Sequence, residues 1–238
     1  MAQLFVGTSG WAYPTWKPDF YPPKLAQKKF LNHYATQLNT VEVNFTFRQL
    51  VKESTIQNWL QDTPADFRFG IKAHQVITHI KRLKGTEDFV PRFLTTIEPL
   101  AAAGKLGPVL FQLPPNLKVD VGLLKDFLAI LPRSVPAAFE FRHDSWFNDA
   151  TWELLKSSKA ALCVAETETL TTPDIATGGF VYYRFRKPNY TPEERSSMIE
   201  RIGHHMAEGR DVFAYFKHEE TPEGALFALD LLQGIQKS

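Results

Sequence analysis

The chain has 238 residues, of which 44% are hydrophobic and 22% are charged, and Cys163 is its single cysteine. These values are typical of a globular protein and exclude a disordered chain, a collagen-like chain, a disulfide framework and a cysteine-rich zinc site. The 27 basic and 26 acidic side chains give a formal net charge of +1. Any attraction for nucleic acid or for an acidic membrane therefore has to be local. We find no signal-peptide pattern and no membrane-length apolar run, so we expect a cytoplasmic protein.

Short β-type runs alternate with helix-like stretches along the whole chain. The strands are expected to begin near Leu4, Val41, Phe67, Val109, Ala137, Ala161, Phe180 and Val212. The helices are expected over Lys24–His33, Lys52–Gln61, Phe89–Ala103, Gly122–Leu131, Asp149–Ser158, Pro192–Glu208 and Pro222–Gln236. This alternation favours parallel βαβ units, and eight units of about 30 residues fit a single (β/α)₈ TIM-like barrel domain over residues 1–238. A doubly wound open sheet is the alternative, although the first strand is not followed by a Gly-x-Gly-x-x-Gly turn.

Two connections have features of their own. The segment Glu166–Gly179 is rich in threonine and has no convincing helical pattern, so we expect the sixth helix to be missing or replaced by a loop. Thr191-Pro192, followed by Glu193–Arg195, has the pattern of a capped helix start, and Thr221-Pro222-Glu223 repeats it.

Strand alternation predicts which side chains point into the barrel. In the second strand the apolar face of Val41, Val43, Phe45 and Phe47 is expected to meet the helices, which directs Glu42 and Asn44 inward. The first and sixth strands are ambiguous by this criterion. In the other strands the same alternation directs inward Arg68, Gly70, Lys72 and His74; Glu140 and Arg142; Tyr182, Arg184 and Arg186; and Lys217 with Phe213 and Tyr215.

Barrel enzymes build their sites where the strands end, at the C-terminal mouth. The side chains expected there are Glu42, Lys72, Gln112, Glu140, Arg142, Tyr182, Arg184 and Lys217. Because buried charges are costly unless they are paired, two of the four cations are expected to pair with the two glutamates. The remaining positive charge predicts an anionic ligand such as a phosphate. The alternative is a structural charge network that fills the barrel.

Several segments, in order along the chain, carry a resemblance to a known family. They include Gly7-Thr8-Ser9-Gly10-Trp11, Val41-Glu42-Val43-Asn44, Phe69-Gly70-Ile71-Lys72, Phe111-Gln112-Leu113-Pro114-Pro115 and Phe139-Glu140-Phe141-Arg142-His143. In these segments the chain resembles the YecE-like family, known as domain of unknown function seventy-two. The resemblance implies a TIM-like barrel and supports the mouth residues, but it implies no activity. Two segments, Arg186-Lys187-Pro188 and Phe216-Lys217-His218-Glu219, depart from the family's pattern and make this mouth more basic.

The first candidate chemistry is the binding of phosphate or the cleavage of phosphodiesters. Arg142 and Arg184 can make bidentate contacts with phosphate oxygens, and Lys72 and Lys217 can act as point charges. The residues expected to orient the ligand are Asn44, Gln112, Tyr182 and His143. A single-stranded nucleic acid is a further possible partner, since Trp11, Trp146 and Tyr190 can stack on bases. Core packing is the alternative for both tryptophans.

Other chemistries remain open at this stage, as does the absence of any chemistry. Glu42 and Glu140 form the pair that a glycosidase-type mechanism needs, although the four cations oppose the raised pKa of its acid. Lys72 or Lys217 can form a Schiff base with a carbonyl compound. A metal site would draw on Glu42, His74, Glu140, His143 and Glu166, but a cation-rich face repels metal ions, so we expect no metal and no cofactor. A barrel that only binds a metabolite or nucleic acid is the non-catalytic alternative.

Overall fold

Eight parallel strands close into a barrel in the computed structural model, which describes residues 2–166, 170–217 and 220–236. The strands follow one another in chain order, and β8 pairs with β1 from Leu4 opposite Val212 to Thr8 opposite Phe216. The expected TIM-like barrel is confirmed. The alternative of a doubly wound open sheet is wrong, because an open sheet has two unpaired edge strands, whereas here β1 and β8 pair with each other. The strands are β1 (Leu4–Ser9), β2 (Thr40–Val43), β3 (Arg68–Lys72), β4 (Leu106–Gln112), β5 (Ala137–Glu140), β6 (Ala161–Ala165), β7 (Phe180–Phe185) and β8 (Asp211–Phe216).

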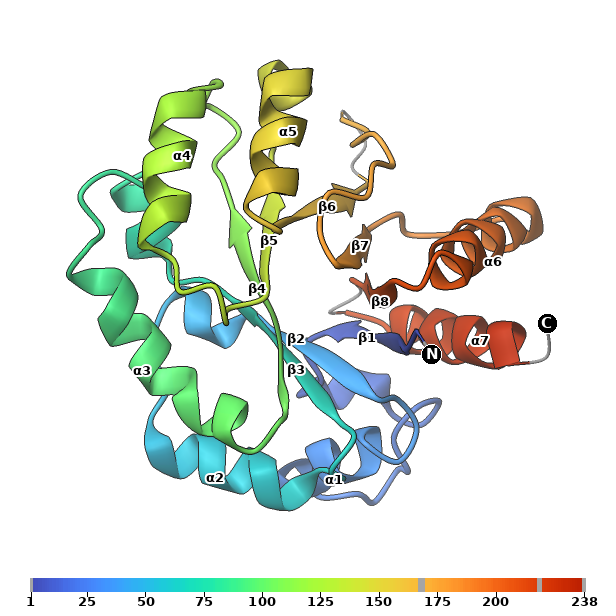
Figure 1. Cartoon of the computed structure of the whole chain (residues 1–238). Coiled ribbons are helices and arrows are strands. Elements are labelled where there is room, and N and C mark those ends of the chain that lie inside the picture. The colour runs from blue at the N-terminus through green and yellow to red at the C-terminus, as the bar shows by residue number, and fades with distance from the viewer. Residues whose placement is uncertain (1, 167–169, 218–219, 237–238) are drawn as a thin grey trace.

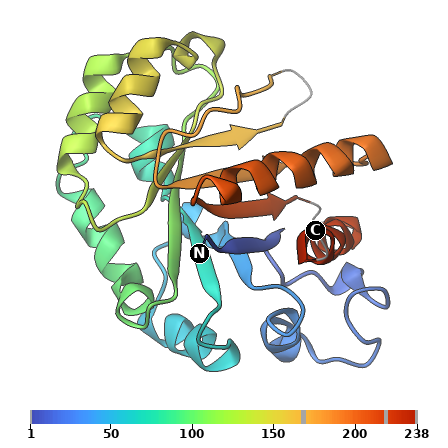
Figure 2. The same ribbon diagram turned by 45° about the vertical axis from the view of Figure 1, so that its right-hand side comes forward.

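Helices surround these strands on the outside (Figures 1 and 2). All the expected helical stretches are present, although the first begins as a 3₁₀ turn over Gln27–Lys29. Thr191 caps its helix through a reciprocal capping box with Glu194, as the Thr-Pro pattern predicts. Among the described residues, no helix is both long and apolar enough to cross a membrane. The helices are α1 (Phe30–Tyr34), α2 (Glu53–Asp62), α3 (Phe89–Ala102), α4 (Val121–Ile130), α5 (Asp149–Ser157), α6 (Pro192–Ala207) and α7 (Glu223–Gln236).

The connection between β6 and β7 is irregular, as expected. Its described part, residues 166 and 170–179, contains no helix and passes between α5 and α6 (Figure 1); residues 167–169 lie outside the described residues. Thr177 fixes it to the barrel, because its hydroxyl donates to Ala160 O and accepts from Leu162 N, both at 2.8 Å. Asp174 accepts hydrogen bonds from the Tyr183 hydroxyl at 2.9 Å. Polar anchors thus replace the apolar face of the missing helix.

Apolar side chains form two separate layers, one on each side of the strands. Phe69, Phe139 and Tyr183 belong to the outer layer, between the strands and the helices. This arrangement confirms the alternation predicted for the third, fifth, seventh and eighth strands. It also resolves the ambiguous strands, since Phe5 of β1 and Cys163 of β6 point inward. The inner layer consists of Phe5, Leu110, Ala138, Ala161, Cys163, Ala165, Tyr182, Phe213 and Tyr215.

Gly70 of β3 makes room inside the barrel for the ring of Tyr215. A Cβ atom at Gly70 would lie only 2.6 Å from the Tyr215 hydroxyl oxygen. That hydroxyl instead lies 2.9 Å from Thr40 Oγ1 across the barrel. Packed side chains therefore fill the barrel interior below the mouth, and the inward charged side chains at the mouth lie on top of this apolar layer.

The alternation in the second strand ends earlier than expected. β2 stops at Val43, and Phe45–Phe47 form a 3₁₀ turn instead of extended chain. The outward position predicted for Phe45 and Phe47 is therefore wrong, and Phe45 is 47% exposed. Thr46 holds the turn against the neighbouring strand by donating to Lys72 O at 2.7 Å.

Candidate functional site at the barrel mouth

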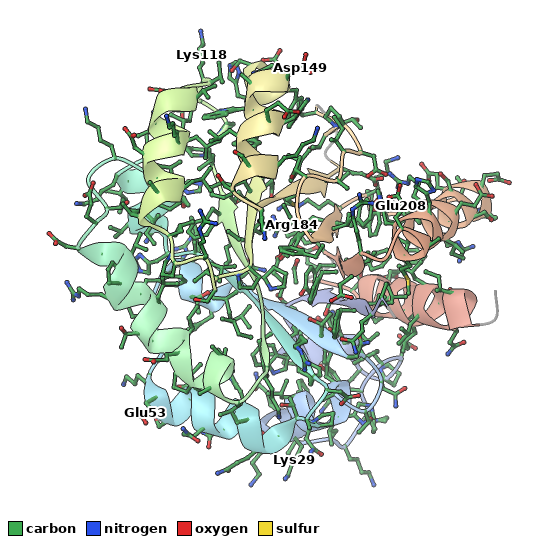
Figure 3. The ribbon with its side chains drawn as sticks, in the orientation of Figure 1. Lys29, Glu53, Lys118, Asp149, Arg184 and Glu208 are labelled. Carbon is green, nitrogen blue, oxygen red and sulfur yellow. The ribbon has the colours of Figure 1, made fainter. Side chains whose placement is uncertain are left out.

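A buried Glu–Arg–Glu cluster lies where β2, β5 and β7 end. The guanidinium of Arg184 contacts Glu42 Oε1 at 2.6 Å through one terminal nitrogen and Glu140 Oε2 at 2.5 Å through the other. Both glutamates are fully buried and Arg184 is 2% exposed. Figure 3 shows Arg184 among the strands, whereas the other labelled residues lie on the periphery. One arginine thus bridges both carboxylates, and Arg186 makes a longer contact with Glu140 Oε2 at 3.5 Å. The expectation was that two of Lys72, Arg142, Arg184 and Lys217 would pair with the two glutamates.

The remaining carboxylate positions are occupied by hydrogen-bond donors. Glu42 accepts from Ser9 at 2.8 Å, from Asn44 at 3.2 Å and from the Tyr182 hydroxyl at 2.6 Å. The Gln112 amide donates to both oxygens of Glu140 at 2.9 Å. These bonds offset much of the cost of burying the two charges.

The cluster keeps Glu42 ionised. Burial opposes its negative charge, but Arg184 and the hydrogen bonds from Tyr182, Arg184 and Ser9 outweigh that effect, so the pKa of Glu42 is lowered. Burial and the neighbouring Glu42 raise the pKa of Tyr182 well above its usual value. A glycosidase acid needs a raised pKa, and Glu42 has the opposite shift. Glu42 therefore does not fit the acid of a two-carboxylate mechanism.

A cavity of about 460 Å³ opens above the cluster. Among the described residues, six cationic side chains line it and no carboxylate does. Of the residues expected at the mouth, Asn44, Lys72, Gln112, Arg142, Arg184 and Lys217 line this cavity. The complete lining consists of Asn44, Phe45, Phe47, Arg48, Gln49, Lys72, Gln112, Arg142, Arg184, Arg186 and Lys217.

Sequence reasoning missed four of these lining residues, namely Phe45, Phe47, Arg48 and Gln49. They belong to the turn that follows β2, and a loop after a barrel strand is where lining residues are expected. The alternation of apolar residues continues from β2 through Phe47, so the sequence predicted extended chain where the structure has a turn. It also missed Ser9, because the first strand has mixed polarity on both faces.

Lys72 occupies an unusual position in the cavity wall. Its Nζ lies 4.4 Å from the centroid of the Phe47 ring. Within the described part of the chain, this nitrogen has no hydrogen-bond or ion-pair partner. Burial, followed by the charge of Arg184, lowers the pKa of Lys72 to about 8. The pKa of nearby His79 is also lowered, by burial and by the charges of Lys72 and Arg142.

Several predicted ligand contacts lie elsewhere. Trp146 is fully buried and donates from Nε1 to Leu117 O at 2.8 Å, and Tyr190 is 6% exposed, so the prediction that they stack on bases is wrong. Trp11 packs edge-on against Trp59 at 5.7 Å and is not part of the cavity lining. His143 is also outside the lining, and its Nδ1 accepts from Ser145 N at 3.2 Å. Tyr182 lies below the cavity and acts on Glu42.

The candidate metal ligands do not converge. In the described ranges, no group of three or more His, Cys, Asp or Glu side chains is placed to hold a metal ion. The inward position predicted for His74 is wrong, because β3 ends at Lys72 and the His74 ring packs 5.1 Å from the ring of Phe89.

The closed barrel and its charged mouth define a TIM-barrel protein with a buried Glu–Arg–Glu cluster at the ends of its strands. A family model described as "Protein of unknown function DUF72" matches residues 5–238. The chain belongs to this family.

Curated and solved relatives agree with this assignment. The chain is 30% identical over 157 residues to UPF0759 protein YunF of Bacillus subtilis, covering 63% of this chain and 54% of that one. It is 32% identical over 145 residues to UPF0759 protein YecE of Escherichia coli, covering 60% and 50%. The matches thus span about half the length of these curated relatives.

The similarity to solved structures extends over the whole barrel. A DUF72 family protein from Thermotoga maritima has a TM-score of 0.87 at 26% identity, with 98% of this chain and 99% of that one covered. A xylose isomerase domain containing protein from Salmonella typhimurium has a TM-score of 0.53 at 8% identity, with 99% and 96% covered. The second likeness shows the fold alone.

Proposed function

We propose that the protein binds a small phosphate-bearing anion in the cavity at the barrel mouth. The observation that carries the proposal is the wall of this cavity, to which the described part of the chain contributes six cationic side chains and no carboxylate. Glu42 and Glu140 lie behind Arg184, and the three side chains together carry a net charge of −1. Arg186 also contacts Glu140 at 3.5 Å, and the five lining cations other than Arg184 leave the wall positive. Clefts lined by one sign of charge concentrate ligands of the opposite sign.

The geometry supports a division of roles around the anion. Both terminal nitrogens of Arg184 already donate to glutamates. Arg184 would therefore contribute its positive charge and hold Glu42 and Glu140 in place beneath the ligand. Arg142, Arg186 and Lys217 would supply the direct contacts, and Lys72 would add its positive charge when it is protonated. Arginine suits bidentate contact with phosphate oxygens, whereas lysine acts as a point charge. Asn44 and Gln112 would orient the ligand from the edge of the cluster.

The size of the cavity favours a small molecule over a nucleic acid strand. Its volume of about 460 Å³ lies in the range usual for small-molecule sites. Two basic residues of the neighbouring region are engaged within the protein: Lys187 pairs with Glu194 at 2.8 Å, and Arg195 pairs with Asp230 at 3.4 Å. The aromatic platform expected for bases is largely in the core.

A thermal-shift titration at low salt, with chelator present, tests the proposal. The panel comprises inorganic phosphate, sugar phosphates, neutral sugars and a short single-stranded oligonucleotide. A ligand at about a hundred times its dissociation constant should stabilise the protein by about 2.7 kcal/mol. Arg142→Ala should weaken phosphate binding at least about tenfold, since a hydrogen bond to a charged group contributes about 1.5–3 kcal/mol.

Arg133→Ala is the matched control, because Arg133 is exposed and does not line the cavity. Equal phosphate affinity in both variants, or no stabilisation by any phosphate, would overturn the proposal. Stabilisation by the oligonucleotide alone, with a steep dependence on salt, would also overturn it and identify a polymer as the ligand.

A further inference from the structure

We propose that Lys72 is a nucleophile for carbonyl compounds, and that the ligand class is an aldehyde or ketone that carries a phosphate. The product of the first chemical step is a Schiff base on Lys72 Nζ. This inference rests on the proposed function, because the cations around Lys72 would hold the phosphate while the amine reaches the carbonyl carbon.

The lack of a partner for the Lys72 amine is the first argument. The chain has another buried lysine, Lys105, whose Nζ donates to Leu60 O at 3.0 Å, to Thr63 O at 2.7 Å and to Thr63 Oγ1 at 3.0 Å. Reaction at Lys105 would sacrifice these bonds, and it lies outside the cavity. Within the described residues, Lys72 Nζ makes no hydrogen bond or ion pair and lies over the face of the Phe47 ring. Glu42 and Glu140 act on it only through their charge and raise its pKa, against the larger lowering effects of burial and Arg184. The Lys72 ammonium group can therefore lose its proton without breaking a hydrogen bond or an ion pair within the described residues.

The charge arrangement is the second argument. An amine attacks a carbonyl only when it is unprotonated, and neighbouring cations and burial favour that form. The carboxylates that could hold Lys72 as an ammonium ion are Glu42 and Glu140, and Arg184 occupies both at 2.6 Å and 2.5 Å. The resulting pKa of about 8 leaves a substantial fraction of neutral amine near neutral pH.

The position within the cavity is the third argument. Lys72 is the last residue of β3, and Arg142, Arg186 and Lys217 line the same cavity. A phosphate bound by these cations would place the rest of a small molecule within the space that Lys72 borders. Phe45 and Phe47 give that space an apolar side, against which the carbon atoms of the ligand can pack.

The step is balanced without an oxidant or a reductant. The Lys72 ammonium first loses a proton to solvent. The nitrogen lone pair then forms a bond to the carbonyl carbon, and the C=O π pair moves to oxygen, which takes up a proton. The nitrogen of this carbinolamine still carries two protons and a positive charge. One of these protons leaves with the hydroxyl group as water, which breaks the C–O bond and leaves a protonated C=N bond between the ligand and Lys72.

Borohydride trapping tests the inference on the intact chain. The protein is incubated with dihydroxyacetone phosphate, reduced with sodium borohydride and mapped by peptide mass spectrometry. We expect one adduct, located on Lys72, at least about tenfold more abundant than on exposed Lys84. Inorganic phosphate should compete with it, and unphosphorylated dihydroxyacetone should label Lys72 far less. Lys72→Met should abolish the adduct, and Lys84→Met should leave it unchanged.

The outcomes separate this inference from the proposed function. If inorganic phosphate stabilises the protein but the adducts are spread over exposed lysines and Lys72 is unmodified, Lys72 is not the nucleophile and the anion site stands. If phosphate neither stabilises the protein nor competes, the proposed function fails. Because the mapping is done on the wild-type chain, the result does not depend on whether Lys72→Met folds.

Discussion

The guanidinium of Arg184 holds together two carboxylates that are fully withdrawn from solvent. Taking such charges out of water costs several kcal/mol for each ion, and a buried pair is tolerated only when the geometry is good and the remaining lone pairs are satisfied. Ser9, Tyr182 and Gln112 satisfy them here. Removal of Arg184 would therefore leave two buried carboxylates without this cation, whereas removal of one glutamate leaves Arg184 paired with the other.

Glu42→Gln should lower the free energy of unfolding by about 1–3 kcal/mol, because the new amide nitrogen would face the buried donors of Arg184 and Tyr182 and leave one of them without its acceptor. Glu153→Gln is the control, because Glu153 is 72% exposed and pairs with Lys156 at 3.0 Å on the surface. An exposed pair contributes less than about 1 kcal/mol. Urea unfolding midpoints of the two variants measure the difference, and equal losses would contradict the assignment.

The same substitution should change the response to acid. Because the pKa of Glu42 is lowered in the folded state, its contribution is present above the unfolded carboxyl pKa and is lost as the pH falls through the lowered value. Glu42→Gln should therefore flatten the loss of stability below about pH 4. Stability measured by urea unfolding between about pH 2 and about pH 6 checks this prediction. If the loss of stability at low pH is the same in both proteins, Glu42 is not among the groups that take up protons on acid unfolding.

The connection between β6 and β7 shows how an element can be replaced. The other βα units are held to the barrel by the buried face of a helix, whereas this segment is held by a few hydrogen bonds. Those of Thr177 with Ala160 and Leu162 are buried. A buried backbone N–H without a partner costs about 1–3 kcal/mol. The attachment of this segment to the barrel thus depends on single side chains, whereas a helix is attached through contacts of many side chains.

Thr177→Val should destabilise the protein by about 1–3 kcal/mol, because the Leu162 N–H loses its acceptor while the side-chain volume is kept. Thr95→Val serves as the control, since Thr95 is exposed on α3. Hydrogen exchange at the Leu162 amide should become faster in Thr177→Val only. Unchanged protection of that amide would show that the hydroxyl is not the anchor.

On the scale of the whole molecule, an almost neutral chain concentrates positive charge at one end of its barrel. The formal net charge is only +1, yet six cations line one cavity. The barrel brings them together from β3 and β7 and from the segments that follow β2, β5, β7 and β8, which are far apart in sequence. The potential of the mouth is therefore a property of the closed sheet and not of the composition.

Binding of an anion should be coupled to proton uptake. The pKa of Lys72 is about 8 in the free protein, and a bound anion favours the ammonium form and raises that pKa. At pH 8 the complex should consequently carry more protons than the free protein. Titration calorimetry with sulfate, which does not titrate itself, should give enthalpies that differ between buffers of different ionisation enthalpy.

Lys72→Met should remove this dependence on the buffer, while Lys84→Met should retain it. Uptake of less than a few tenths of a proton by the wild type would contradict the assignment of Lys72 to the anion site.

Local pattern was sufficient to predict the barrel and most of its inward charges. Hydrophobic alternation has a period of two residues and is set by the strand itself, so it placed Glu42, Glu140 and Arg184 on the inner face. The helix boundaries and the irregular sixth unit follow from equally local signals. Each of these features depends on neighbours within a few residues.

Contacts across the barrel could not be read in the same way. Alternation assigns a face but not a distance, so it did not reveal that one arginine bridges both glutamates or that Lys72 lacks a partner. The positions of Phe47 and Trp146 depend on where a strand stops and on what packs above it. Closure of the sheet brings together side chains that are distant along the chain, and their mutual distances decide the charge and chemistry of the mouth.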